Sequence, residues 1–430
     1  MTARWTALLI GVAVVVGLTP ATTTAAAAPA PLAVDPNAFE PSSFAVGADP
    51  RGIAMVSAEL GKPGFVANSG DGTVTLFTTC QPKSCSPSPS SSIQAGLSPT
   101  AVVSNSDASV AYVSLSGSDA VAVMAYSSGS PATVTGTIPV GPRPAGLAID
   151  APGARVYVAN NGGDSVSVID TASRAVVATV PVGARPWGVA IGPSGARVYV
   201  ANNGGDSVSV IDTATNTVVA TVPVGSAPGD IALDPQGAFA YVTNNAGASV
   251  SVIDTSSGSV VATIPVGGQP WGIAVTADGG HAFVANYADG TVSAIRLATR
   301  TVVATIRVGA NPFAVAAWPD SVGPFSAAYV TNAGSGSVST IPLMAAVPNV
   351  TWSSRARLVR GVVPLVAGVE FGIRAVSKGK VRTGTCRQAG GAAQVACTVR
   401  LPKGTWRVSV TSRLPWQQVA AGNQNKKFRL

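Results

Sequence analysis

The residues best suited to ligand chemistry lie beside the proline of a V-G-x-x-P motif that recurs, in loose form, seven times. Trp187, Trp271 and Phe313 directly follow this proline, and Arg51 follows it in the first copy. Polar residues precede the proline in four copies, three of them the copies with the aromatic residues: Arg143, Arg185, Gln269 and Asn311. Aromatic rings with a few polar groups favour an unidentified small molecule, glycan or peptide as the ligand. The alternative is that the rings only fill a channel or pack between repeats.

Catalysis is the less favoured interpretation of these residues. His281 is the only histidine of the chain, and we expect it in an exposed turn, away from the prolines. Histidine-based hydrolysis and metal–histidine sites are therefore disfavoured. The only acidic residues near the prolines are Asp49 and Asp230, and one such pair gives weak support for acid–base chemistry. We expect no catalytic residue, no cofactor and no bound metal.

Other repeated polar residues are expected to stabilise turns. An asparagine that ends a strand in nearly every repeat should bond the backbone of its own turn: Asn68, Asn160, Asn202, Asn244, Asn286 and Asn332. Three aspartates in the string IDT should accept turn amides: Asp170, Asp212 and Asp254. Three more occupy loops with a faint likeness to calcium loops: Asp164, Asp206 and Asp289. No D-x-D-x-D run accompanies them, so we interpret them as solvated turn acids.

These residues belong to a tandem repeat. Tyr157, Tyr199, Tyr241 and Phe283 mark copies spaced by 42 residues, and weaker copies surround them. Each copy holds four short alternating segments separated by Gly, Asn, Asp and Pro turns, which is the signature of strands. Four strands per repeat, in seven copies, predict an all-β chain with a seven-bladed β-propeller. One opening should then be shared by all the proline motifs.

The two ends of the repeat region are complementary. The last copy lacks a fourth strand, while residues 43–47 form a strand-like segment before the first copy. We therefore expect residues 43–47 to complete the last blade, which would cover an open sheet edge.

The repeat resembles the YVTN family of β-propellers, the YncE-like or surface-layer type. The resemblance depends on YVTNN at 241–245, YVTN at 329–332, and YVAN with its SVSVIDT sequel at 157–160 and 199–202. It covers about 300 residues and implies a secreted or cell-surface propeller. It does not imply one activity, because propellers include binding proteins, lyases and dehydrogenase subunits. A binding role is favoured, and an enzyme or enzyme subunit of the quinoprotein-dehydrogenase or lyase type is the alternative.

A second, basic domain follows the repeats. Residues 1–342 carry a net charge of −6 and residues 343–430 one of +14. Alternating segments after Pro348 predict a small β-sandwich of the fibronectin-III or immunoglobulin-like kind, although the match is weak. The charge favours attraction to an anionic cell-wall polymer, acidic lipid or nucleic acid, and a solvated basic face or docking onto the acidic propeller are the alternatives.

The termini and cysteines indicate an extracellular protein. We expect a signal peptide at residues 1–28, a linker at 29–41, the propeller at 42–343 and the basic domain at 349–430. A retained N-terminal anchor is the alternative to cleavage, and no later transmembrane segment is expected. Four cysteines are interpreted as local disulfides, Cys80–Cys85 and Cys386–Cys397, rather than as a zinc site. The product should be a secreted monomer, with surface association an option.

Overall fold

The structure is a computed structural model. It describes residues 41–55, 63–78, 87–127, 130–317 and 327–342, and seven C-terminal segments at 351–355, 358–364, 370–377, 380–388, 394–401, 405–413 and 421–429. The predicted signal peptide, almost all of the predicted linker, and Cys80 and Cys85 lie outside these residues. In the described part of the chain, no helix has the length and hydropathy that crossing a bilayer requires.

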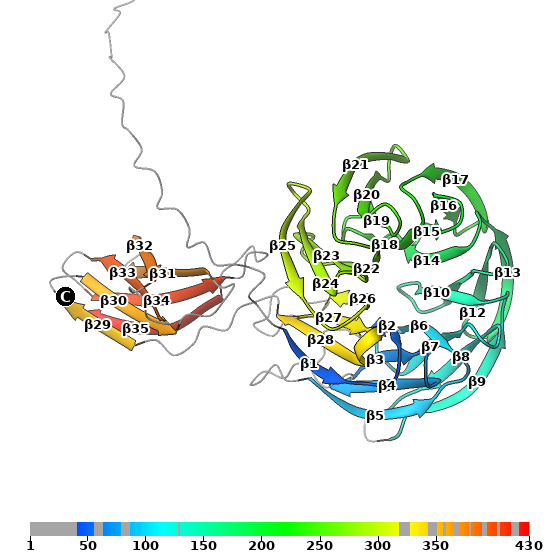
Figure 1. The fold of residues 1–430 in the computed structure, drawn as a ribbon, viewed down its shortest axis with the longest axis horizontal. Helices are drawn as coiled ribbons and strands as arrows, with labels where there is room; N and C mark the ends of the chain where they lie inside the picture. The colour runs from blue at the N-terminus through cyan, green and yellow to red at the C-terminus, as the bar shows by residue number, and fades with distance from the viewer. Residues whose placement is uncertain are drawn as a thin grey trace, which may run out of the picture.

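Seven four-stranded antiparallel sheets are arranged around a central channel (Figure 1). The innermost strands are β2 (Pro50–Ala54), β6 (Pro99–Ser104), β10 (Pro144–Ile149), β14 (Pro186–Ile191), β18 (Pro228–Leu233), β22 (Pro270–Val275) and β26 (Pro312–Ala317). The second strands are β3 (Pro63–Asn68), β7 (Val110–Leu115), β11 (Arg155–Asn160), β15 (Arg197–Asn202), β19 (Phe239–Asn244), β23 (His281–Asn286) and β27 (Ala327–Asn332). The predicted seven-bladed propeller is confirmed.

The third and outer strands complete each blade. The third strands are β4 (Thr73–Thr78), β8 (Ala120–Ala125), β12 (Ser165–Asp170), β16 (Ser207–Asp212), β20 (Ser249–Asp254), β24 (Thr291–Arg296) and β28 (Ser337–Pro342). The outer strands are β5 (Ser88–Gln94), β9 (Thr133–Pro139), β13 (Ala175–Pro181), β17 (Thr217–Pro223), β21 (Ser259–Pro265), β25 (Thr301–Arg307) and β1 (Ser42–Ala45). A short 3-10 helix, η2 (Ala333–Ser335), connects β27 to β28.

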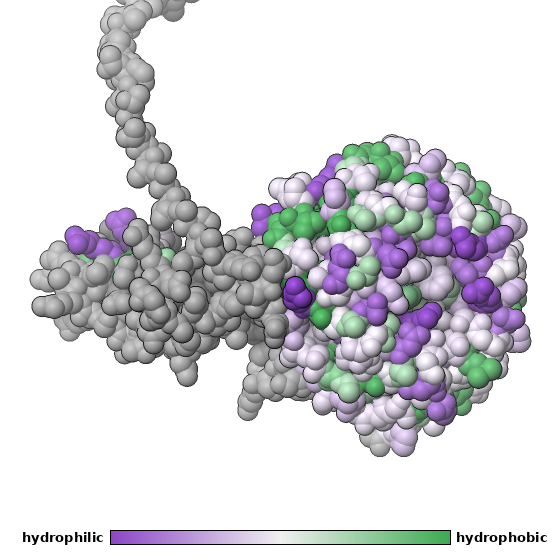
Figure 2. Space-filling model, viewed as in Figure 1, coloured by the Kyte–Doolittle hydropathy of each residue, from purple (hydrophilic) through white to green (hydrophobic). Residues whose placement is uncertain are grey.

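The apolar core lies between neighbouring blades. Second and third strands are buried along nearly their whole length, because both of their faces are covered by adjacent blades. Tyr157, for example, is 1% exposed and packs in one cluster with Val198 and Val200 of the following blade. The outer strands are mostly exposed or partly buried, and exposed valines such as Val177 and Val219 lie on them. Figure 2 shows the face of the propeller that Figure 1 views as mostly polar or neutral, with apolar patches toward the rim.

The N-terminal strand closes the ring, as predicted. β1 pairs antiparallel with β28, from Ser42 opposite Thr340 to Ala45 opposite Ser337. Phe44 also packs against Phe77, with ring centroids 5.2 Å apart. The last blade is therefore assembled from both ends of the repeat region, which removes the exposed edge that β28 would otherwise present.

The repeated asparagines have a different role from the one predicted. Asn202 is fully buried, and its Nδ2 donates to the hydroxyls of Ser207 at 3.1 Å and Ser209 at 2.9 Å rather than to its own turn backbone. The glycine of the V-G-x-x-P motif lies against this side chain, since a Cβ on Gly183 would come within 2.6 Å of the Asn202 Cγ. The motif glycine and the strand-end asparagine therefore depend on each other, and the pattern recurs at Asn68, Asn160, Asn244, Asn286 and Asn332.

Replacing Asn202 with Ala should destabilise the propeller by about 2 kcal/mol, because two buried hydroxyls lose their donor and a small cavity forms. The neighbouring Asn203 is a matched control. It is only partly buried, and it makes one bond, from Nδ2 to the Pro228 carbonyl at 3.0 Å. Asn203→Ala should cost less than half as much in denaturant unfolding. Equal losses for the two variants would contradict the role given to Asn202.

The C-terminal region is a separate all-β unit. Its strands are β29 (Thr351–Arg355), β30 (Leu358–Pro364), β31 (Glu370–Ser377), β32 (Lys380–Gln388), β33 (Gln394–Arg400), β34 (Thr405–Arg413) and β35 (Ala421–Arg429). They pair in one connected order, β29-β30-β33-β32-β31-β34-β35. β32 joins the two halves, because its first part pairs with β31 and its last part with β33. The predicted β-domain is present, whereas packing as a two-sheet sandwich is not confirmed.

The backbone of this unit brings two cysteines together. Cys386 of β32 lies directly opposite Cys397 of β33 in the strand register. Directly opposed positions on paired strands allow the short Cα separation that a disulfide needs. The predicted Cys386–Cys397 pairing is compatible with this register and stays a prediction.

Candidate ligand-binding site

A bulge at the start of each innermost strand presents the residue after the motif proline. Pro186 pairs with Asn202 and Val189 with Val200, so the register shifts across Trp187 and Gly188. Bulges of this kind change the direction of a side chain. The same shift occurs after Pro270 and Pro312, next to Trp271 and Phe313. All three aromatic residues are therefore presented by the same local device.

The residue before each motif proline has a left-handed backbone conformation. Its φ lies between 49° and 52° in all seven copies: Asp49, Ser98, Arg143, Arg185, Ala227, Gln269 and Asn311. Hydrogen bonds to side chains stabilise this backbone conformation. Asp164 Oδ1, for example, accepts a hydrogen bond from the Arg185 amide at 2.8 Å. Asp206 and Asp289 accept similarly from the Ala227 and Gly268 amides. These aspartates are exposed turn residues, as predicted, and they also tie the second-to-third-strand loop to the motif that enters the next blade.

The aromatic residues form one cluster on one side of the channel. The ring centroids of Trp187 and Trp271 are 5.1 Å apart, and those of Trp271 and Phe313 are 5.2 Å apart and nearly parallel. Trp187 and Trp271 belong to blades that are not adjacent, so the blade between them must leave space. It carries Gly229 at the equivalent position, where a Cβ would lie 3.2 Å from Trp271 Cε3. Gly229 therefore allows the two indoles to meet.

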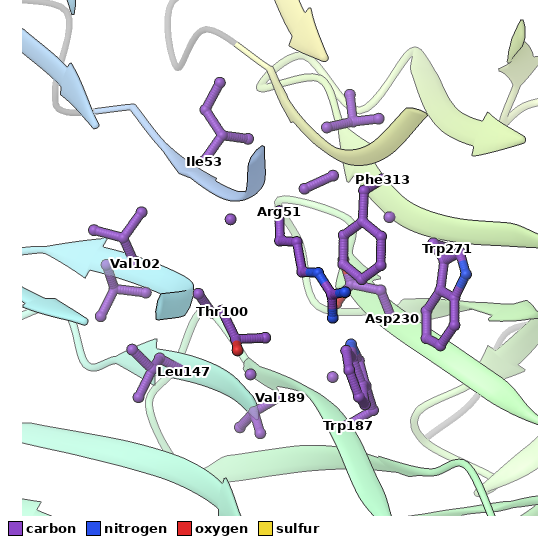
Figure 3. A pocket seen from close by; sticks show the side chains of 18 residues that line it. Arg51, Ile53, Thr100, Val102, Leu147, Trp187, Val189, Asp230, Trp271 and Phe313 are labelled. Carbon is purple, nitrogen blue, oxygen red and sulfur yellow. The ribbon is translucent and has the colours of Figure 1, made fainter. Parts of the chain in front are cut away.

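A cavity of about 180 Å³ remains beside this cluster. In Figure 3, Arg51, Trp187, Trp271 and Phe313 lie close together, and apolar side chains line the rest of the wall. The lining residues that carry polar or aromatic groups are Arg51, Thr100, Trp187, Asp230, Trp271 and Phe313. The rings fill part of the channel and also border an open space. The two interpretations from the sequence, channel filling and ligand contact, therefore both apply in part.

The polar residues before the proline do not reach this cavity. Arg143, Arg185 and Gln269 are exposed, and none of them lines it. Asn311 donates from Nδ2 to the Tyr287 carbonyl at 3.3 Å, also outside the lining. Of the eight residues predicted to bind a ligand, the structure gathers Arg51, Trp187, Trp271 and Phe313 and leaves the other four at the rim. The left-handed backbone before the proline turns these side chains away from the channel.

Residues 90–237 match the family model described as YNCE-like beta-propeller. The match lies within the propeller and covers less than half of the chain, so this part of the propeller is similar to the YncE-like type. The predicted resemblance is thereby confirmed for the propeller. No curated protein matches the sequence.

Two solved structures share the fold of this propeller. A hydrazine synthase chain from Kuenenia stuttgartiensis is 22% identical with a TM-score of 0.61, and the match covers 68% of this chain and 95% of that one. A functionally unknown protein from Desulfotomaculum acetoxidans DSM 771 is 18% identical with a TM-score of 0.51, covering 60% and 86% respectively. At these identities the likeness shows the fold alone.

The two charged side chains that line the cavity, Arg51 and Asp230, differ in whether they have an ion-pair partner. Arg51 Nη2 lies 3.0 Å from Asp49 Oδ2, and its guanidinium stands 5.5 Å from the centre of the Phe313 ring. Asp230 accepts the amides of Ile231 at 2.9 Å and Ile273 at 3.3 Å. Burial raises the pKa of Asp230 to about 6. Among the described residues this carboxylate forms no ion pair, whereas Arg51 forms one.

Hydrogen bonds from the second strands fix the backbone that carries the indoles. Thr243 Oγ1 donates to the Trp271 carbonyl at 2.6 Å and accepts from the Asp230 amide at 2.9 Å. Asn161 Nδ2 donates to the Pro186 carbonyl at 3.2 Å, immediately before Trp187. These contacts join neighbouring blades at the channel, so the cavity wall is held by the propeller scaffold rather than by loose loops.

Sequence reasoning underrated two contributors to the site. From the sequence, Asp230 was noted only together with Asp49, as weak support for acid–base chemistry. In the structure, Asp230 lines the cavity, whereas Asp49 does not line it and pairs with Arg51. A signal for Asp230 was present, because it occupies the position of Gly188 and Gly272 in other copies of the motif. Tyr287 packs edge-on against Phe313, with the ring centroids 6.3 Å apart. Nothing in the sequence pattern indicated that Tyr287 lies near the site.

Two other groups lie away from the cavity. His281 was predicted to be exposed, but it is 3% exposed, and its backbone amide donates to Thr276 Oγ1 at 3.0 Å. Its alignment with Arg155 and Arg197, which are partly buried, did not indicate this burial. The IDT aspartates behave as predicted: Asp170 Oδ1 accepts the Ser173 amide at 2.8 Å, and these bonds lower its pKa. Asp212 and Asp254 bind their turns in the same way.

Proposed function

We propose that this protein is a secreted or cell-surface binding propeller that takes a small ligand at the cavity between Trp187, Trp271 and Phe313. The observation that supports this most directly is the aromatic cluster next to an open cavity. The rings remain partly accessible, and their backbone is fixed by bonds between blades. Rigid aromatic surface with one or two polar groups is typical of small-ligand sites.

Catalysis stays the second candidate, as an enzyme or enzyme subunit. An acid–base mechanism needs two ionisable groups that face the same reacting atom. The cavity lining brings together one arginine and one aspartate, and the arginine is already paired with Asp49. This arrangement supports recognition of a ligand better than proton transfer.

Substituting either indole should weaken binding at the cavity. Intrinsic tryptophan fluorescence of the mature protein is titrated with a panel of sugars, peptides, amines and carboxylates. We expect at least one class to give a saturable change that is reduced at least tenfold in affinity by Trp187→Ala and by Trp271→Ala, because each variant removes a wall of the cavity. Trp406→Phe, in the basic domain, is the control and should retain the response. An identical response in all variants, or none to any ligand, would rule out the site.

The basic domain has a proposed role of its own. With a net charge of +14 over residues 343–430, it would hold the propeller near an anionic cell-wall polymer, or near acidic lipid or nucleic acid. Deletion of residues 345–430 should remove salt-sensitive retention on wall material while leaving ligand binding by the propeller intact. Retention that survives the deletion would assign it to the propeller instead.

A further inference from the structure

We propose that the ligand of the cavity is a small organic cation, held by the Asp230 carboxylate and the faces of the aromatic cluster. The inference rests on the proposed function and adds the chemical class of the ligand. The argument comes from the charge balance of the cavity, from the character of its walls and from its size.

The charge balance leaves a negative group available. Arg51 is the only basic side chain in the lining, and both its Nε and its Nη2 lie 3.0 Å from Asp49 Oδ2. Its charge is therefore paired with a carboxylate that does not line the cavity, although the guanidinium itself lies at the cavity wall (Figure 3). Asp230 receives only two backbone amides, one from its own strand and one from β22. A partly buried carboxylate without a cation gains most from a ligand that brings one.

The walls favour the same kind of ligand. The ring faces of Trp187, Trp271 and Phe313 carry negative electrostatic potential, and tryptophan is the ring that binds cations most strongly. Arg51 already makes such a contact with Phe313 at 5.5 Å, which shows that this ring face accepts a cation. The two indoles meet at 5.1 Å and are inclined by 49°, so they form a corner rather than one flat surface. A rounded ammonium group fits a corner better than a planar sugar ring does.

The size of the cavity limits the ligand. A volume of about 180 Å³ corresponds to roughly six water molecules at about 30 Å³ each. It is smaller than the cavities of roughly 300–1,000 Å³ that hold drug-sized molecules. The cavity therefore has room for an alkylammonium or quaternary ammonium head, free or at the end of a larger molecule.

Binding of such a cation should depend on pH through Asp230. The elements packed against β18 carry Arg197 and Tyr199 on β15 and Tyr241 on β19, none of which lines the cavity. Burial raises the pKa of both tyrosines, to about 12 for Tyr241, so they stay neutral below pH 8. Burial likewise raises the pKa of Asp230 to about 6. A cation of fixed charge should therefore bind roughly tenfold more weakly at pH 5 than at pH 7.5, because Asp230 becomes protonated.

Choline and its neutral isostere 3,3-dimethyl-1-butanol provide the test, by titration calorimetry and tryptophan fluorescence of the full-length protein. We expect choline to bind at least tenfold more tightly than the isostere. Asp230→Asn should remove this preference together with the pH dependence. Asp150→Asn is the matched control: it neutralises a carboxylate that accepts the Arg155 amide at 3.0 Å in a first-to-second-strand turn, and it should leave choline binding unchanged. Melting temperatures of both variants establish that they fold.

The outcomes separate this inference from the proposed function. Equal affinities for choline and the isostere, or choline binding unaffected by Asp230→Asn, would overturn the cation inference. A response that depends on Trp187 but comes only from neutral sugars or carboxylates would overturn it too, and would leave the binding function intact. No response to any member of the panel would remove both.

Discussion

A chain that begins at Val46 is expected to lose most of the stability of the last blade. Without β1, the four residues that pair with β28 are gone, and Phe44 no longer covers Phe77. Loss of this ring contact and of the strand ladder should cost about 3 kcal/mol. The freed edge of β28 should also promote association between molecules.

Thermal melting and size-exclusion chromatography measure these two effects. A chain that begins at Pro41 keeps β1 and is the matched control, and Phe44→Ala separates the ring contact from the strand pairing. We expect the melting temperature to decrease in the order of the Pro41 chain, Phe44→Ala and the Val46 chain. If the Val46 chain melts like the control and stays monomeric, closure by β1 contributes nothing to stability.

Gly146→Ala is expected to be the most damaging single substitution near the cavity. Neighbouring innermost strands approach so closely that a Cβ on Gly146 would lie 2.3 Å from the Trp187 carbonyl oxygen. The obstructing atom belongs to the backbone, so neither strand can move without breaking bonds between blades. Overpacking of this kind costs about 3 kcal/mol, which exceeds the gain of up to about 1 kcal/mol from restricting the unfolded chain.

A second glycine in the same protein provides the control. No atom lies within 4 Å of a Cβ placed on Gly136, in the outer strand β9. Gly136→Ala should be neutral or slightly stabilising, because alanine restricts the unfolded chain. Denaturant unfolding of both variants, with the tryptophan fluorescence maximum as a local probe, tests the comparison. Gly146→Ala should lower the midpoint and shift the Trp187 emission, and equal midpoints would refute the close approach of the strands.

The sequence determined the fold of the propeller because its information is local and repeated. The marker at Tyr157 and its copies, the turn glycines and the motif prolines each specify one strand or one turn. Repetition then leaves a ring as the arrangement that covers every blade face. The unmatched strand at residues 43–47 was sufficient to predict closure, and the structure places β1 at Ser42–Ala45.

The details of the site depended on distances between blades, which a linear repeat does not encode. That Trp187 touches Trp271 follows from the small size of Gly229 in the intervening blade. That Arg185 points away follows from its left-handed backbone, which the adjacent proline did not reveal. The burial of His281 likewise became visible only in the folded chain.

The sequence by itself therefore established an all-β, seven-bladed propeller, its closure, and the motif position at which ligand-binding residues would be found. The three-dimensional fold was needed to show which of those residues share a cavity, and that Asp230 lies there without an ion-pair partner among the described residues. The physical reason is that strand patterns depend on near neighbours in the chain. Cavity walls depend instead on the size of side chains brought together from several blades, and on which charges are already paired.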